Sequence, residues 1–135
     1  MRVYLSQPFA GYTNFSGLLS QFKRFIENQP EWETSYHLDF DFTGLADSEI
    51  VSLDLDHVSK CDLILVDLST PNLGGGVWGE LYHAYRSGIP IVVICPDSAW
   101  DSPWIRHHVT HRFRTGDITL VEEIFEVCKK LTEKK

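Results

Sequence analysis

The stretch Asp62-Leu-Ile-Leu-Val-Asp67, with the glycine-rich loop at 69–76 behind it, decides the fold of this chain. Its aliphatic run has no polar interruption, which is typical of a strand buried on both faces in a parallel sheet. Parallel strands need a crossover connection, and a helix-forming segment through about Arg86 supplies one before the next aliphatic run, Ile91–Cys95. The sequence therefore predicts a β–α–β unit at the centre of the protein.

The same alternation of strand and helix extends toward the start of the chain. A β-prone run at 3–5 comes first, and apolar residues at helical spacing predict a helix over 18–26. Residues 36–42 alternate between polar and apolar, as a half-buried strand or an extended loop would. A further helix is expected from about Asp47, with Asp47 as its N-cap and Glu49 in its first turn.

Toward the other end, residues 96–117 are polar, aromatic and irregular, and an apolar stripe from Leu120 to Leu131 predicts a last helix. No repeat or linker divides the 135 residues. We therefore expect residues 1–135 to form a single α/β domain. Its predicted architecture is a three-layer flavodoxin-like or Rossmann-like fold with a mainly parallel sheet of four to five strands.

Composition narrows the class of protein. Lys and Arg number 12 against 19 Asp and Glu, for a formal net charge of -7, and no long basic run occurs, so neither a nucleic acid polymer nor an anionic membrane is an expected partner. The odd cysteines Cys61, Cys95 and Cys128 form no CxxC pair, which argues against a disulfide framework or a thiolate zinc site. No leader-like or membrane-spanning apolar run is seen, so a cytoplasmic location is expected.

Glu80 is the first candidate for chemistry. In open α/β sheets ligands bind beyond the carboxyl ends of the strands, which is where the loop before Glu80 is expected. Gly74 and Gly76 would let the backbone approach a ligand closely. We expect Glu80 in the first turn of the following helix, where the helix dipole favours an ionised carboxylate by roughly 0.3–1 kcal/mol. An ordinary helix-start preference explains the same residue equally well.

Two aspartates are further candidates. At 100° per residue Val51, Leu55 and Val58 share one helix face, with Asp54 at its edge. A half-buried Asp54 reaching toward the strand end could orient a sugar hydroxyl or assist proton transfer; the alternative is a solvated flank residue. Asp67 closes the central strand, where capping of a turn is the commoner role.

Other motifs carry less weight. Gly74, Gly76 and Gly79 fit GxGxxG, but Glu80 would place negative charge where a pyrophosphate must sit, and too little chain follows for a dinucleotide-binding sheet. The sequence has no GxxxxGK[ST] loop. The histidines at 107, 108 and 111 lack an HExxH glutamate, so we expect no metal site and no cofactor.

With these residues in view, the chain resembles the nucleoside 2-deoxyribosyltransferase family and its relatives, the deoxynucleoside 5'-monophosphate N-hydrolases. The likeness begins at VYLSQPF, with Gly11 at a matching place. It is strongest over DLDHVSKCDLILVDLSTPNLGGGVWGELYHAYRSGIPIVVI, where an acid-bearing helix, an aliphatic strand, a turn and a glutamate follow in the family's order. It continues more weakly through PDSAWDSPWIR and covers most of the chain apart from roughly residues 28–46.

The resemblance implies a reaction and roles for the two carboxylates. Glu80 would be the nucleophile that attacks the anomeric carbon and displaces the base, and Asp54 would match the family's second active-site acid. A covalent glycosyl-enzyme would form and pass its sugar to a second acceptor, as in retaining glycosidases. Another nucleobase as acceptor makes a transferase, which we favour; water makes a hydrolase.

In the monophosphate-cleaving branch hydroxyl groups help to hold the 5'-phosphate. The resemblance places Ser102 at one such position, which the family supplies from the neighbouring subunit of a homodimer. Asn72 stands where that branch has another serine, and Ala10 stands where it has a phosphate-binding arginine. These departures weaken the expectation of a phosphate site without removing it.

Aromatic residues are expected around the same rim. Trp78, in a loop two residues longer than that of the hydrolases, either stacks on a base or lines the sugar pocket, or else packs in the protein. Phe9, Tyr12, Trp100 and Trp104 would suit base stacking or a subunit interface. The expected partners are thus a small-molecule nucleoside or nucleotide and a second copy of the chain, in a homodimer or larger homo-oligomer. A non-catalytic nucleotide-binding or sensing module on the same fold is the alternative of a different class.

Overall fold

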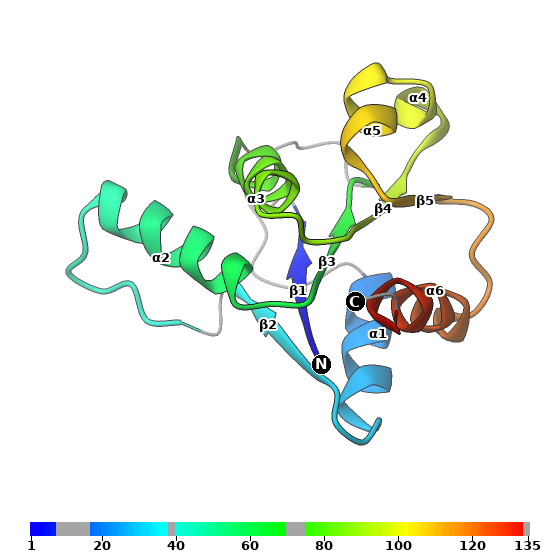
Figure 1. Ribbon diagram of the computed structural model, residues 1–135, viewed down its shortest axis with the longest axis horizontal. Coiled ribbons are helices and arrows are strands. Elements are labelled where there is room, and N and C mark those ends of the chain that lie inside the picture. Colours follow the sequence, from blue (N-terminus) through cyan, green and yellow to red (C-terminus); the bar gives the residue numbers. More distant parts are fainter. Residues whose placement is uncertain (8–16, 38–39, 70–74, 134–135) are drawn as a thin grey trace.

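A five-stranded, all-parallel sheet runs through the centre of the molecule in the order β2-β1-β3-β4-β5 (Figure 1). The computed structural model describes residues 1–7, 17–37, 40–69 and 75–133. The prediction of a flavodoxin-like α/β domain with four to five mainly parallel strands is confirmed. The strands are β1 (Arg2–Ser6), β2 (Glu33–Tyr36), β3 (Leu63–Asp67), β4 (Ile91–Cys95) and β5 (His111–Arg114).

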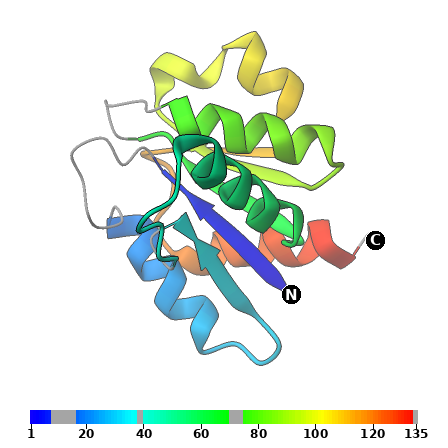
Figure 2. The ribbon, with the colours of Figure 1, turned by 90° about the vertical axis from the view of Figure 1, so that its left-hand side faces the viewer.

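Helices cover both faces of the sheet and give the three layers (Figures 1 and 2). One face of the sheet carries two helices, and the other face carries four helices, two of them short. The first pair is α1 (Gly17–Glu27) and α6 (Val121–Glu133); the second group is α2 (Asp47–Ser59), α3 (Gly75–Arg86), α4 (Asp97–Trp100) and α5 (Pro103–His108).

The core is divided by the sheet, and β1 shows how. Val3 and Leu5 join the cluster beneath α1 and α6, whereas Tyr4 joins the cluster beneath α2, α3 and α5. Side chains alternate across a strand, so Tyr4 and Ser6 face the same side, toward α3. Every residue of β3 is buried, as its aliphatic run predicted. Full burial of each large aliphatic side chain contributes about 1.5–3 kcal/mol to folding.

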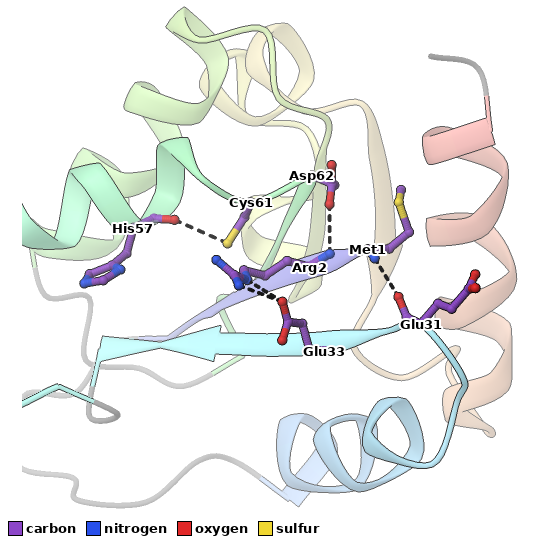
Figure 3. A network of polar contacts seen from close by, with 7 residues as sticks. All are labelled: Met1, Arg2, Glu31, Glu33, His57, Cys61 and Asp62. Atoms are coloured by element: carbon purple, nitrogen blue, oxygen red, sulfur yellow. Dashed lines mark hydrogen bonds and ion pairs between the residues drawn. The ribbon is translucent and has the colours of Figure 1, made fainter.

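A network of polar contacts fixes the amino end of β1 between its neighbours (Figure 3). The Arg2 guanidinium contacts Glu33 on β2 at 2.7 Å, and the Arg2 backbone N–H donates to the Asp62 carboxylate at 2.8 Å, just before β3. The α-amino group of Met1 donates to the Glu31 carbonyl at 2.6 Å. These contacts fix the register of β1 against β2 and β3, and this register sets the positions of Tyr4 and Ser6 farther along the strand.

Two stretches of the chain differ from their sequence predictions. The strand near residue 36 is Glu33–Tyr36, because its register on β1 starts at the pair Arg2–Glu33; of the two alternatives for residues 36–42, the half-buried strand is wrong, and the described residues 40–42 form no strand. After the strand, the Phe40 ring stacks on the His57 ring of α2, with centroids 3.6 Å apart. The irregular region 96–117 holds α4, α5 and the edge strand β5, whose polar sequence, HRFR, hides it.

The start of α2 also differs in detail from the prediction. Ala46, rather than Asp47, is the N-cap, and Asp47 is the first helical residue. Glu49 lies in the first turn as expected, and its carboxylate accepts a hydrogen bond from the Ala46 N–H at 3.1 Å. A carboxylate three residues into a helix can satisfy this backbone donor, which removes the need for a polar N-cap side chain.

The cysteines and the lengths of the helices bear on the predictions made from composition. The cysteines at 61, 95 and 128 are free and buried. Within the described part of the chain no helix is both long and apolar enough to cross a bilayer.

Candidate active site

Glu80 lies on the inner side of α3, above β1. The prediction that it occupies the first turn was wrong: α3 begins at Gly75, so Glu80 is the sixth residue, and no acidic residue lies in the first turn. The reason is that the glycines at 75, 76 and 79 belong to the helix instead of a loop before it. The helix dipole acts within the first turn, so it does not explain the position of this carboxylate.

Two hydroxyl groups from β1 hold the Glu80 carboxylate. The Ser6 hydroxyl donates to Oε1 at 2.8 Å, and the Tyr4 hydroxyl donates to Oε2. Tyr4 is 0% and Ser6 1% exposed, whereas Glu80 is half-buried. The carboxylate is therefore neither sealed in the interior nor free in bulk water, and its direction is fixed from both oxygens.

Burial makes this carboxylate a poor acid. Loss of hydration raises the pKa of Glu80 from 4.5 to about 7, against the hydrogen bonds of Tyr4 and Ser6, which favour the ionised form. The nearby negative charge of Asp54 raises this pKa as well, and His37 lowers it. Burial and the adjacent Glu80 charge raise the pKa of the Tyr4 phenol far above its ordinary value, so Tyr4 stays a hydrogen-bond donor. A side chain that titrates near neutrality beside specific charged partners is typical of a functional site.

A second acid, Asp54, comes from α2 and is paired with a histidine. The Nδ1 atom of His37 lies 2.9 and 2.7 Å from the two Asp54 carboxylate oxygens. The side chains are 30% and 16% exposed, respectively. The His37 ring stacks on Phe42 with centroids 4.7 Å apart, which fixes the plane of the imidazole. Asp54 raises the pKa of Glu80 and His37 lowers it, so the three side chains interact electrostatically.

The face of α2 that turns inward is not the one expected. Val51, predicted to lead an apolar stripe, is 57% exposed, and Val58 is the buried residue of the helix. Asp54 and Val58 are four residues apart and therefore share the inner face. Asp54 thus lies nearer the centre of that face than its edge, while Asp56 is exposed and pairs with Lys60 at 2.9 Å.

The other predicted site residues have different positions. Asp67 ends β3 and is 1% exposed; its Oδ1 accepts the Ser69 N–H at 2.9 Å, a turn-capping contact. A Cβ atom added at Gly76 would meet open space, so packing does not require a glycine there. Four predicted residues, together with Ala10 and Tyr12, lie outside the described residues: Phe9, Gly11, Asn72 and Gly74.

Trp78 and Ser102 share a separate cavity of about 410 Å³ between α3 and α5. Trp104, which is 67% exposed, and His108 line the same cavity and stack on each other with centroids 5.7 Å apart. Residues two apart on a helix point about 200° apart, so Trp78 faces away from Glu80. Within the described part of one chain, the structure groups Trp78 with Ser102 and does not bring either to the Glu80 carboxylate.

Sequence reasoning missed three residues of this site: Tyr4, Ser6 and His37. Tyr4 and Ser6 carried a usable signal, because hydroxyl side chains at alternate positions of a strand share one face, and that face is the one α3 covers. His37 carried none, since it follows a strand whose boundary was itself misplaced. Among the described residues, no group of three or more His, Cys, Asp or Glu side chains is arranged to hold a metal ion.

The comparison with known proteins concerns the fold. No protein-family model matches the sequence, and no curated protein matches it. Among solved structures, a 2-deoxyribosyltransferase from Bacillus psychrosaccharolyticus has a TM-score of 0.66 at 16% identity, covering 92% of this chain and 90% of that one. The CMP N-glycosidase BcmB of Clostridium botulinum has a TM-score of 0.63 at 18% identity, covering 96% and 98%. The receiver domain of the response regulator TorR reaches 0.63 at 12% identity, covering 98% and 97%.

These likenesses establish the fold, which nucleoside-processing enzymes and receiver domains share. At such identities they do not transfer a function, because one fold carries many unrelated sites. The choice between the two kinds of neighbour therefore depends on the side chains around Glu80.

Proposed function

We propose that this protein cleaves the N-glycosidic bond of nucleosides through a covalent glycosyl-enzyme on Glu80 and transfers the sugar to another nucleobase. The observation that carries the proposal is the carboxylate itself: half-buried, held from both oxygens by Tyr4 and Ser6, and next to a second acid, Asp54. A purely phosphate-binding module gains nothing from two carboxylates in its site, because they repel a phosphate.

The first chemical step uses Glu80 in its ionised form. One carboxylate oxygen attacks the anomeric carbon, the C1'–N bond breaks, and its electron pair leaves with the base. The departing base must gain a proton, which in this proposal comes from the Asp54–His37 pair. Glu80 is then an ester and carries no charge.

The second step reverses the roles. A nitrogen of an incoming base, or the oxygen of water, bonds to C1', and the electron pair of the ester C–O bond returns to Glu80 as a carboxylate. The proton of the acceptor passes back to the Asp54–His37 pair, which leaves the site ready for another cycle. The pKa of about 7 at Glu80 means that this cycle requires a pH near or above neutrality.

The nucleotide version of the reaction is the second candidate. A 5'-monophosphate N-glycosidase is supported by the resemblance of Ser102 to a phosphate-binding serine of that branch, and a CMP N-glycosidase is among the fold neighbours. In that branch the serine comes from a partner subunit. We propose the same here, because exposed aromatic residues on α3 and α5, Tyr82 at 50% and Trp104 at 67%, form an apolar surface suited to a homodimer in the cytoplasm.

Product analysis separates these functions. The protein is incubated with deoxynucleosides and with their monophosphates, each with and without a second free base, and the products are resolved by chromatography. A swapped nucleoside identifies a transferase, free base without an acceptor identifies a hydrolase, and unchanged substrate with measurable binding identifies a sensing module. Glu80→Ala should abolish turnover, and Glu122→Ala, an exposed glutamate on the opposite layer, should not. Full activity in Glu80→Ala would reject the mechanism.

Mixing two variants of low activity, assayed at a monophosphate concentration well below the KM of Ser102→Ala, tests the shared site. If Ser102 acts across the dimer, Glu80→Ala and Ser102→Ala subunits complement each other, since one of the two sites in the mixed dimer has both residues. Activity on a monophosphate should then reappear after mixing, to at most about a quarter of the wild-type level for random reassembly. Absence of any recovery, with mixed dimers shown to form, would contradict the arrangement.

A further inference from the structure

The two oxygens of the Glu80 carboxylate are held at different depths. Tyr4, which donates to Oε2, is 0% exposed and lies within the core cluster beneath α3. Ser6, which donates to Oε1 at 2.8 Å, is the last residue of β1. Two residues of a strand span about 6.6 Å, so Ser6 lies that much nearer the carboxyl edge of the sheet. Because ligands bind at that edge, Oε1 is the oxygen that faces them.

An oxygen that bonds to carbon changes what its hydrogen-bond donor can do. Once Oε1 is the alkoxy oxygen of an ester it has no charge and accepts a hydrogen bond poorly, so the Ser6 hydroxyl loses its partner. When the ester breaks, the negative charge returns to Oε1, 2.8 Å from the same hydroxyl. A donor in this place stabilises the carboxylate as a leaving group, because hydrogen bonds to charged acceptors are the strong ones.

We propose that Ser6 is a positioning residue for the second half of the reaction. As the glycosyl-enzyme breaks down, the Ser6 hydroxyl donates a hydrogen bond to the negative charge that returns to Oε1 of Glu80. This inference rests on the proposed function. In the step itself the C1'–Oε1 bond breaks and its electron pair goes to Glu80, while the acceptor bonds to C1' and gives its proton to the Asp54–His37 pair. The Ser6 O–H bond stays intact and only reorients toward Oε1.

The contact is specific rather than a by-product of burial. Ser6 and Glu80 are 74 residues apart in sequence, and their contact joins the sheet to α3. The other groups that act on Glu80 come from different elements: Tyr4 from β1 at the deeper oxygen, Asp54 from α2 and His37 from the end of β2. Ser6 alone of these lies at the edge-facing oxygen, so its removal affects the returning charge directly.

The test compares Ser6→Ala with Ser6→Thr and with Ser35→Ala, which removes a similarly buried serine from β2. For a good donor nucleoside, Ser6→Ala should lower kcat roughly tenfold or more, as expected for loss of a hydrogen bond to a charged group, while kcat/KM changes by only a few fold. Intact-protein mass spectrometry after rapid quenching should show the sugar adduct accumulating in Ser6→Ala. Ser6→Thr should restore turnover without the adduct, and Ser35→Ala should behave as wild type.

Parallel losses of kcat and kcat/KM in Ser6→Ala, with no adduct, would overturn the inference even if the enzyme is a glycosyltransferase. A measurement that does not depend on turnover distinguishes failure of this inference from failure of the proposed function. Carbon-13 NMR of the labelled Glu80 carboxyl group should show its titration midpoint moving upward in Ser6→Ala, because the hydroxyl favours the ionised form. An unmoved midpoint rejects the role of Ser6; a moved midpoint in a protein without activity on any nucleoside rejects the reaction and leaves the contact.

Discussion

Replacing Glu80 by glutamine should stabilise the protein above neutral pH and leave its stability below pH 4.5 almost unchanged. The side chain keeps its shape, and its amide can still pair with the hydroxyls of Tyr4 and Ser6. What it loses is the charge, which burial disfavours strongly enough to bring the pKa of Glu80 to about 7. The stabilisation is therefore expected to grow with pH, and that growth identifies its cause.

The size of the effect follows from the two pKa values. Below pH 4.5 both the folded and the unfolded protein hold the proton. Between 4.5 and about 7 the unfolded chain releases it while the folded protein keeps it, so the folded state loses relative stability as the pH rises. The two pKa values differ by about 2.5, and at about 1.4 kcal/mol for each pH unit the complete loss is at most about 3.5 kcal/mol.

The assay is urea unfolding of wild type and Glu80→Gln at a series of pH values from 4.5 to 8.5. The difference in the free energy of unfolding between the two proteins should rise by about 2–3 kcal/mol across this range, with most of the change below pH 7. Subtraction cancels the titration of every other group that the substitution does not touch. A difference that stays constant with pH would refute the view that burial of the Glu80 charge opposes folding.

Three further predictions concern the site and the core. Asp54→Asn should reduce kcat by two orders of magnitude or more, and His37→Gln by less, with circular dichroism confirming both folds, because the first removes the acid and the second only its partner. Ser102→Ala should raise KM for a nucleoside monophosphate at least tenfold and leave a nucleoside within twofold, as measured by steady-state kinetics on both. Leu65→Ala, in the fully buried β3, should lower the free energy of unfolding by about 2–5 kcal/mol in urea titrations at pH 6.

The fold was accessible from sequence because hydrophobic pattern carries it. The run 63–67 and the run Ile91–Cys95 are buried throughout, and only a parallel sheet covered on both faces buries such strands completely. The edge strands were not accessible in the same way. β2 and β5 are short and contain polar residues, because an edge strand is less enclosed than a central one. Each also pairs with a single neighbouring strand, and the local sequence does not reveal which strand that is.

The site was predicted in part for a different reason. Glu80 and Asp54 could be singled out because carboxylates near strand ends are chemically conspicuous, and the resemblance to a family reinforced both. Tyr4 and Ser6 resemble ordinary strand residues until α3 is placed over them. His37 could not be singled out from sequence, since its contact with Asp54 joins the residue after β2 to α2. The local sequence pattern indicates which residues are unusual, whereas the residues they contact are determined by tertiary packing.

The hydroxyls of β1 resolve a conflict between the two halves of the proposed reaction. A carboxylate with a raised pKa is a better nucleophile but a worse leaving group, so burial alone would speed attack on the sugar and slow its release. Hydrogen bonds act in the opposite sense, because they stabilise the charge that release restores. Tyr4 donates to the deeper oxygen of Glu80 and Ser6 to the oxygen that faces the edge of the sheet. The site therefore combines a Glu80 pKa near neutrality with two hydrogen-bond donors that stabilise the carboxylate when its charge returns. A carboxylate that had to act only once would need the burial and not the donors, and this is the reason to seek the effect of Ser6 in the second step.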